Sequence, residues 1–566
     1  MFALSLSLSS LIKISIIFTL LGSWCCLSTR AEDILLKCDE TDLLDSLFCT
    51  VSGFQVSHSQ NVKIPNQTKA NLKRFMKFYN SVLLYIPAKL FDVFSSLTNF
   101  DASYTEIEDI PRNTFSSANS LVTLNLSNNK LEKITTSAFV GAHNLMRLDL
   151  SYNRLHTLTN LTFTGLNELS RVVLASNRLK ILPKDLFAEN SYLDEVNLSN
   201  NLLEFIEPEV FNHLDNIREV NLTNNLLRML DPKTFANSYA LEVLYISNNQ
   251  LLEFRLANKS VSKTLNLSHN KLTTLLINAT RSIYAGNNRI TQVEVINGRE
   301  LVALLLQNNQ IKDITNITTT LTNLYELDLS FNPVGTPNIS TYQRLEHITE
   351  LYLRSTGIRY LTFGMFSKLK SLSVLDLSYN NLTELNLEIF VPSNDHMKHF
   401  YVDANNLTEI QGKYTFASAF PFLQQLGISR NRFNCSYLHW LLISPQLMEA
   451  TQLHIETDNS DEEVTHIRDV TCVSHVREDL KRVEHDLYHS DELKKILQQS
   501  LETMSLHAQQ MQSYLLVLKI SLIVLVCVII VVGWHYGRIL RAKYQVRRGG
   551  AIVYHSNATM STQMEQ

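Results

Sequence analysis

Five tyrosines between residues 245 and 401 are the side chains best suited to recognise another molecule. Tyr245, Tyr284, Tyr352 and Tyr401 each lie between two apolar residues, and Tyr325 lies nearby. Exposed aromatic side chains on a rigid scaffold are typical of protein-binding hot spots. Tyrosine is also a favourable strand residue, so the alternative is a purely structural role. We predict that these five residues bind a protein or microbial ligand.

Asparagine-linked glycosylation is the second chemistry that the sequence offers. Asn125, Asn197, Asn221 and Asn266 occupy the same position between apolar residues as the tyrosines do, and each begins an Asn-x-Ser/Thr sequon. Glycans there would stand on the same surface as the tyrosines. Nine further predicted glycosylation sites lie elsewhere in the chain: Asn66, Asn160, Asn258, Asn278, Asn316, Asn338, Asn381, Asn406 and Asn434.

Four of the seven cysteines are expected to form disulfides. Cys38 and Cys49 lie close together near the N-terminus, and Cys435 and Cys472 lie far downstream. We expect these two neighbouring pairs, because the ends of a long repeat domain are far apart. Four cysteines nevertheless allow three connectivities, and the sequence alone does not choose among them. The other three cysteines lie in apolar segments near the two ends of the chain: Cys25, Cys26 and Cys527.

No catalytic constellation accompanies these residues. The sequence lacks a glycine-rich phosphate loop, cysteines at metal-site spacing and a G-x-S-x-G elbow. His485 and His489 are four residues apart, and we assign them to a solvated helix face rather than to a metal site. The net charge of −4 gives no basis for nucleic-acid binding. We therefore expect a binding protein that is not an enzyme and uses no cofactor.

These residues must be positioned by a repeat that dominates the chain. The pattern L-x-x-L-x-L-x-x-N-x-L recurs in sixteen units between residues 73 and 433, and the first eight units begin 24 residues apart. A period in this range with this pattern predicts a leucine-rich-repeat solenoid. Within L-x-x-L-x-L the leucines point to one side and the intervening residues to the other. We expect an α/β horseshoe whose concave side is a parallel sheet that carries the tyrosines.

Two ladders of side chains should join neighbouring repeats. The asparagine of the motif is present in thirteen units, and Ser81, Thr105 and Thr356 replace it in the other three. Its amide can satisfy backbone groups where the strand turns away. A phenylalanine eighteen residues into the longer units predicts a stacked aromatic spine, which stops after Phe235 and resumes at Phe366, with Tyr342 as a substitute before it. The units without the spine are shorter.

The two ends of the chain carry segments typical of a type I membrane protein. We predict a signal peptide at residues 1–31 and a transmembrane helix at 514–535, followed by basic residues in a cytoplasmic tail at 536–566. Between them we expect an N-terminal cap at 32–72, the repeats at 73–433, a C-terminal cap at 434–475 and a coiled coil at 476–513. The protein would then lie in the plasma membrane with its repeats outside.

The coiled coil is predicted from a heptad pattern. One register of apolar residues runs through residues 476–515 without proline or glycine, interrupted by Ser490 and Lys494. We expect pairing with an identical or a related chain, and a lone helix packed on the cap is the alternative. The residues predicted to make the dimer contact are Leu480, Val483, Leu487, Leu497, Leu501 and Met504.

The order of these segments resembles the leucine-rich-repeat immune proteins of mosquitoes. The resemblance rests on the Cys38/Cys49 pair, the repeats, the closing Asn434-Cys435 segment with Cys472, and the coiled coil directly after it. It implies a role in innate immunity, pairing through the coiled coil, and a complement-like thioester protein as partner. The membrane span departs from the secreted members of that family. A leucine-rich-repeat adhesion or developmental receptor without an immune role is the alternative.

Overall fold

The computed structural model describes residues 33–38, 47–56, 61–65, 70–87, 89–211, 213–256, 261–393, 395–412, 415–442, 452–454, 465–467 and 470–472. The chain divides into two compact units, Met1–Val473 and Ser474–Gln566, and the described residues all belong to the first. The predicted signal peptide, coiled coil, six dimer-contact residues, transmembrane helix and tail lie outside the described residues. Within the described ranges, no helix is both long and apolar enough to cross a membrane.

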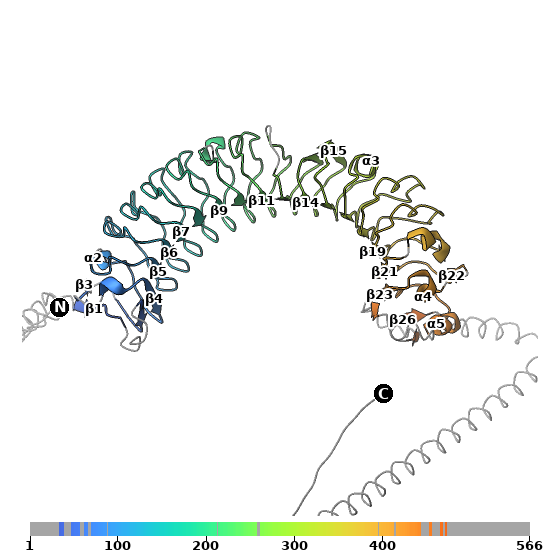
Figure 1. The fold of residues 1–566 in the computed structure, drawn as a ribbon, viewed down its shortest axis with the longest axis horizontal. Helices are drawn as coiled ribbons and strands as arrows, with labels where there is room; N and C mark the ends of the chain where they lie inside the picture. The colour runs from blue at the N-terminus through green and yellow to red at the C-terminus, as the bar shows by residue number, and fades with distance from the viewer. Residues whose placement is uncertain are drawn as a thin grey trace, which may run out of the picture. The chain divides into compact units, whose positions relative to one another are not determined.

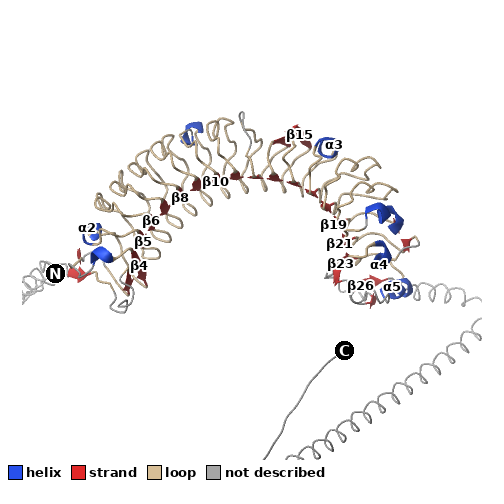
Figure 2. Cartoon of the chain, in the orientation of Figure 1, coloured by secondary structure: helices blue, strands red, loops and turns tan. Residues whose placement is uncertain are grey.

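One long parallel sheet lines the inner side of the arc formed by the first unit (Figures 1 and 2). Each strand of this sheet pairs in parallel with the next strand of the sheet, because successive repeats place the same three motif positions at the same point of each turn. Most strands have only three residues, with a buried middle residue. In order, the sheet contains β2 (Phe48–Ser52), β4 (Phe75–Tyr79), β5 (Asn99–Asp101), β6 (Thr123–Asn125), β7 (Arg147–Asp149), β8 (Arg171–Val173), β9 (Glu195–Asn197), β10 (Glu219–Asn221), β11 (Val243–Tyr245), β12 (Thr264–Asn266), β14 (Ser282–Tyr284), β16 (Ala303–Leu305), β17 (Glu326–Asp328), β18 (Glu350–Tyr352), β19 (Val374–Asp376), β21 (His399–Tyr401), β23 (Gln425–Gly427) and β24 (Gln452–His454).

The sheet extends beyond the predicted repeats at both ends. Strand β2 belongs to the predicted N-terminal cap and pairs with β4, and β24 belongs to the predicted C-terminal cap and pairs with β23. The remaining strands form separate two-stranded pairs: β1 (Asp33–Leu35) with β3 (Asn61–Lys63), β13 (Thr274–Asn278) with β15 (Gln292–Asn297), β20 (Leu385–Asn386) with β22 (Ile410–Gln411), and β25 (Thr465–Ile467) with β26 (Val470–Cys472). Short helices complete the described fold: α2 (Leu90–Val93), α3 (Thr315–Thr320), α4 (Phe416–Ala419) and α5 (Cys435–Leu442), with the 3₁₀ turns η1 (Ala70–Leu72), η2 (Pro208–Phe211) and η3 (Leu387–Ser393).

The asparagine ladder is present and joins each repeat to the one before it. Asn225 is typical: its Nδ2 donates to the carbonyl oxygens of Leu198 and Leu222, at 3.0 Å each. Its Oδ1 accepts the backbone N–H of Leu203 at 3.1 Å. Asn225 is 5% exposed, so these bonds satisfy backbone groups that water cannot reach. The replacements differ: the Thr105 hydroxyl contacts the Ala102 carbonyl and Asn129, whereas the Ser81 hydroxyl accepts the backbone N–H of Phe54 in the preceding turn at 3.0 Å.

The aromatic spine is also confirmed, in two segments. Buried rings from Phe91 to Phe235 stack on one another with centroid distances of 5.0–6.4 Å. The second segment begins with Tyr342, whose fully buried ring stacks on Phe366 at 5.9 Å, and continues to Phe390. Between the segments, β13 and β15 replace the rings with alternating buried aliphatic residues such as Leu275 and Ile277. A parallel strand pair therefore takes over the outer side of the solenoid in the short units.

Candidate functional site

The predicted tyrosines lie on the concave sheet, but in two separate pairs. Four of them occupy the third residue of their strands, and the register aligns these third residues into one continuous row, which we call the third row. Tyr245 and Tyr284 lie on either side of Asn266 in this row. Tyr352 and Tyr401 lie on either side of Asp376, and strands β16 and β17 separate this pair from the first. Tyr325 precedes β17, is 49% exposed and stacks on His347 at 6.0 Å.

A cluster of carboxylates surrounds the later tyrosine pair. Glu326 and Glu350 are direct neighbours on β17 and β18, and Asp328 and Asp376 lie in the third row on either side of Tyr352. Burial raises the pKa of Glu326, and the charges of Glu350 and Asp328 raise it further. Burial also raises the pKa of Asp328, against the hydrogen bonds from Ser330. We call Glu326, Asp328, Glu350 and Asp376 the acidic surface; it carries closely spaced, partly desolvated negative charge.

The hydroxyls of the later tyrosines are held by neighbouring side chains. The Tyr352 hydroxyl donates to Glu350 Oε2 at 2.7 Å, and the Tyr401 hydroxyl donates to Gln425 Oε1 at 2.5 Å. The pKa of Tyr352 is raised strongly, first by burial and then by the hydrogen bond to Glu350 and the neighbouring carboxylates. Both side chains therefore remain neutral and oriented. Fixed aromatic side chains lose little conformational entropy on binding, which suits them to a protein contact.

A stack of arginine and aromatic side chains flanks the acidic surface. The Arg354 guanidinium carbon lies 4.1 Å from the ring centroid of Tyr379 and 5.9 Å from that of Phe331, which are cation–π distances. Arg430 Nη1 donates to the Tyr379 hydroxyl at 2.7 Å. Phe331, Tyr379 and Arg430 have backbone φ angles of 57°, 54° and 53°. Bulky residues rarely adopt this left-handed conformation, which asparagine tolerates best.

This stack was not predicted from the sequence, and the left-handed backbone of its residues is not a signal specific to it. The residue directly before the ladder asparagine is itself asparagine in several repeats, as at Asn200, Asn224 and Asn248, which have the same left-handed backbone. Phe331, Tyr379 and Arg430 break that preference in three alternate repeats, with Ser355 and Ala404 at the same position between them. Tyr104 and Tyr152 have the same backbone conformation in early repeats, so the late end is distinguished by the contacts of Arg354 and Arg430 with Tyr379.

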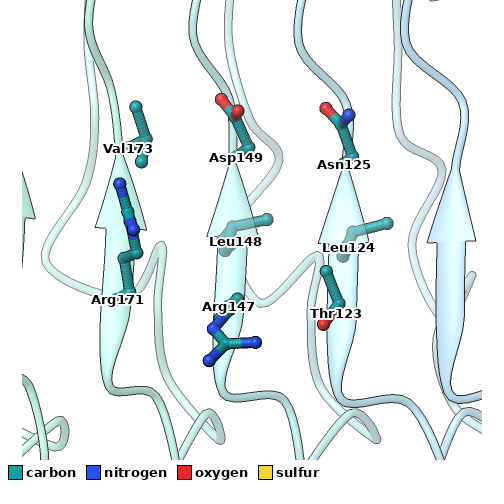
Figure 3. Close-up of a pocket in the computed structure, with 8 residues that line it drawn as sticks. All are labelled: Thr123, Leu124, Asn125, Arg147, Leu148, Asp149, Arg171 and Val173. Atoms are coloured by element: carbon teal, nitrogen blue, oxygen red, sulfur yellow. The ribbon is translucent and has the colours of Figure 1, made fainter. Parts of the chain in front are cut away.

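The early part of the concave face has a different character. A hollow of about 220 Å³ is lined by side chains of β6, β7 and β8 (Figure 3). Asn125, Asp149 and Val173 stand at one level of the sheet, and Thr123, Arg147 and Arg171 stand at the level below. Arg171 forms an ion pair with Glu195 at 2.9 Å. Asn125, one of the predicted glycosylation sites, is among the residues that line this hollow.

The other predicted modification sites are distributed over the solenoid. Asn125, Asn197, Asn221 and Asn266 lie in the third row, and the Oδ1 of each accepts the backbone N–H two residues later, at 3.0–3.1 Å. Asn66 and Asn258 lie outside the described residues. The exposed sites are Asn160, Asn316, Asn338 and Asn381, and the half-buried ones are Asn278, Asn406 and Asn434.

Both cysteine pairs form disulfides in the structure. Cys38 joins Cys49, and Cys435 joins Cys472. The first bond ties the chain before β2 to the first strand of the sheet, and the second ties α5 to β26, so each lies at one open end of the solenoid. Terminal repeats expose core side chains and need such caps. Among the residues that the structure describes, no three His, Cys, Asp or Glu side chains are grouped so as to hold a metal ion.

Known proteins share this architecture. Residues 108–242 and 204–332 match the family described as BspA type leucine rich repeat region, and residues 346–394 match the family described as leucine rich repeat. This chain is a leucine-rich-repeat solenoid. Lumican of Rattus norvegicus is 29% identical over 247 residues, which cover 38% of this chain and 71% of lumican.

Solved structures of leucine-rich-repeat proteins have the same fold. The APL1 leucine-rich-repeat domain is 22% identical with a TM-score of 0.51, and the match covers 78% of this chain and all of that domain. TLR13 in complex with ssRNA13 is 24% identical with a TM-score of 0.53, over 68% of this leucine-rich-repeat chain and 54% of TLR13. At these identities the likeness shows the fold alone, and the solenoid is a scaffold typical of non-enzymatic binding proteins.

Proposed function

We propose that this leucine-rich-repeat protein is a cell-surface recognition protein that binds a protein ligand with a basic surface through its late concave face. The observation that carries the proposal is the arrangement of Tyr352 and Tyr401 on either side of Asp376, within the acidic surface. No third-row residue from Tyr284 to Gly427 is an asparagine, so this part of the sheet is free of sequons.

The charge of the face favours a cationic partner. Glu326 and Glu350 face each other across neighbouring strands, where like charges oppose one another. Lysine or arginine side chains of a ligand would relieve this repulsion while packing on the two tyrosines. The TLR13 structure holds an RNA, but phosphate groups would be repelled by the acidic surface described here. A protein with exposed basic side chains is therefore the ligand class that fits.

The biological setting that we propose is innate immunity at the plasma membrane. The predicted signal peptide and transmembrane helix place the repeats outside the cell, where the two disulfides are stable. The immune role and a complement-like thioester protein as candidate partner rest on the resemblance of the segment order to the leucine-rich-repeat immune proteins of mosquitoes. An adhesion or developmental receptor is the alternative. Expression in blood cells with induction by infection would favour the immune role, and expression at contacts between developing cells would favour the alternative.

A matched pair of charge reversals tests the binding face. Glu326→Lys with Glu350→Lys reverses two neighbouring carboxylates on the late face, and Glu195→Lys with Glu219→Lys does the same at equivalent positions of β9 and β10. Full-length chains displayed on cultured cells are incubated with extracellular fluid of the source organism, and crosslinked proteins are quantified by mass spectrometry. We expect cells that display the late pair of substitutions to capture at least tenfold less ligand than cells that display the unmodified chain. Cells that display the early pair should capture as much as the unmodified chain. Retention by the late pair with loss by the early pair would contradict the proposal.

The proposed pairing through the membrane-proximal helix needs its own test. Leu487→Pro and Leu501→Pro each interrupt the predicted helix at a contact position. We expect both substitutions to abolish the dimer that a cell-surface crosslinker traps in the unmodified chain. A dimer that survives both changes would place the contact in the repeats.

A further inference from the structure

Asn266 lies between two tyrosines on the concave sheet. The register pairs it with Tyr245 on β11 and with Tyr284 on β14, so the three side chains stand side by side in the third row. Neighbouring strands lie about 4.8 Å apart, which places the two tyrosine backbones about 10 Å from each other. We propose that the first N-acetylglucosamine of an N-linked glycan on Asn266 is held between the rings of Tyr245 and Tyr284.

The asparagine is oriented for such an attachment. Its Oδ1 accepts the backbone N–H of Ser268 at 3.1 Å, which fixes the plane of the carboxamide. Its Nδ2 makes no hydrogen bond to any residue that the structure describes, so the nitrogen that would carry the sugar is available. The Oδ1 bond survives when Nδ2 is glycosylated. The first sugar would therefore leave the sheet in a defined direction, between the two flanking side chains.

Two aromatic rings form a suitable cradle for a pyranose. The C–H groups on the face of a sugar ring carry partial positive charge, and the face of an aromatic ring is negative. Tyr245 and Tyr284 are both half-buried, so the sugar would cover apolar surface that is now partly exposed to water. A spacing of about 10 Å across one strand leaves room for one sugar ring in contact with a phenol on each side.

The other sequons of the third row lack this environment. Asn197 has Val173 and Asn221 as its neighbours, and Asn125 has Asp101 and Asp149. Asn221 has a tyrosine on one side alone. Asn266 is thus the position in this row where two aromatic rings flank the attachment nitrogen, and Asn197 is its matched control.

The arrangement divides the four predicted ligand-binding tyrosines of the third row. A glycan on Asn266 would cover Tyr245 and Tyr284 and remove them from the surface that a protein ligand can reach. Tyr352 and Tyr401, which flank Asp376, would remain bare. The inference rests on the extracellular location in the proposed function, since N-linked glycans are added in the secretory pathway.

The test measures how fast each glycan is removed from the native protein. The full-length chain is produced in cultured eukaryotic cells, purified in detergent and treated under native conditions with peptide-N-glycosidase F, which cuts at the asparagine–sugar bond. Glycopeptide mass spectrometry follows each site separately. We expect release at Asn266 to be about tenfold slower than at Asn197, because contact with two rings must be broken first. Tyr245→Ala with Tyr284→Ala should remove that difference, and Tyr245→Phe with Tyr284→Phe should preserve it.

Each outcome bears on one proposal. If Asn197 and other sites carry glycans but Asn266 does not, the cradle is wrong and the extracellular location stands. Equal release rates at Asn266 and Asn197 in the unmodified chain would also overturn the proposed cradle. Slow release at Asn266 that persists in the Tyr245→Ala with Tyr284→Ala variant would overturn it as well. If no sequon is occupied, the location assumed in the proposed function fails first. Tyr352→Ala with Tyr401→Ala is the control substitution and should leave release at Asn266 unchanged.

Discussion

Replacing Tyr342 by phenylalanine should stabilise the protein. Tyr342 is fully buried, and its ring stacks on Phe366 at a centroid distance of 5.9 Å and an interplanar angle of 12°. Its hydroxyl has no hydrogen-bond partner in the described part of the chain, and burial strongly raises its pKa. The spine therefore needs the ring at this position and gains nothing from the hydroxyl.

The size of the effect follows from that missing partner. A buried polar group without a hydrogen bond costs about 1–3 kcal/mol, and Tyr342→Phe removes the group while keeping the stacked ring. We expect the free energy of unfolding to rise by about 1–2 kcal/mol. Tyr342→Ala removes the ring as well and should lower it by about 3–5 kcal/mol, because a cavity remains in the spine.

The assay is urea denaturation followed by circular dichroism, with amide hydrogen exchange of residues 342–348 as a local readout. Phe366→Tyr is the matched control, since it introduces a hydroxyl into the same column of rings and should destabilise the protein. A Tyr342→Phe variant less stable than the parent, or a neutral Phe366→Tyr variant, would refute the reasoning that the hydroxyl is unsatisfied.

Three further predictions concern the ladder, the cap and the acidic surface. Asn225→Ala should cost about 1–3 kcal/mol, since it leaves the buried N–H of Leu203 without a partner while the carbonyls of Leu198 and Leu222 keep the Nδ2 donors of Asn201 and Asn249, and limited proteolysis should then cut near that repeat. Replacing Cys435 and Cys472 by serine should cost about 2–5 kcal/mol of stability, measured by the urea midpoint relative to the disulfide-bonded parent, because the bond closes a loop of 37 residues. The pKa of Glu326 is raised in the folded state, so its ionisation destabilises the fold, and stability falls as pH rises from the ordinary value of 4.5 through the raised one. Glu326→Gln should therefore be more stable than the parent at pH 7 and equal to it below about pH 4, and a difference that grows on acidification would contradict this sign.

The sequence by itself determined the solenoid, its sheet and its two ladders. Each repeat packs only on its neighbours, so the spacing of leucine and asparagine within one unit specifies the local structure without reference to distant residues. The buried middle residue of each strand, the bonds of Asn225 and the stacking of Tyr342 on Phe366 all follow from that local pattern. The prediction of aromatic residues on the concave face succeeded for the same reason, because strand alternation sets which side chains point outward.

Only the tertiary structure decided which outward-facing residues are neighbours and what surrounds them. Asn266 lies beside Tyr245 and Tyr284 because the strands of the short repeats stay in register. The sequence showed only that the three residues occupy equivalent positions of their repeats. Arg430 reaches Tyr379 across 51 residues of sequence, and neither residue type predicts the contact. The raised pKa of Glu326 depends on burial and on a charge 24 residues away, where Glu350 follows on the next strand. Such properties arise from distances between side chains of different repeats, and those distances exist only after the repeats have stacked.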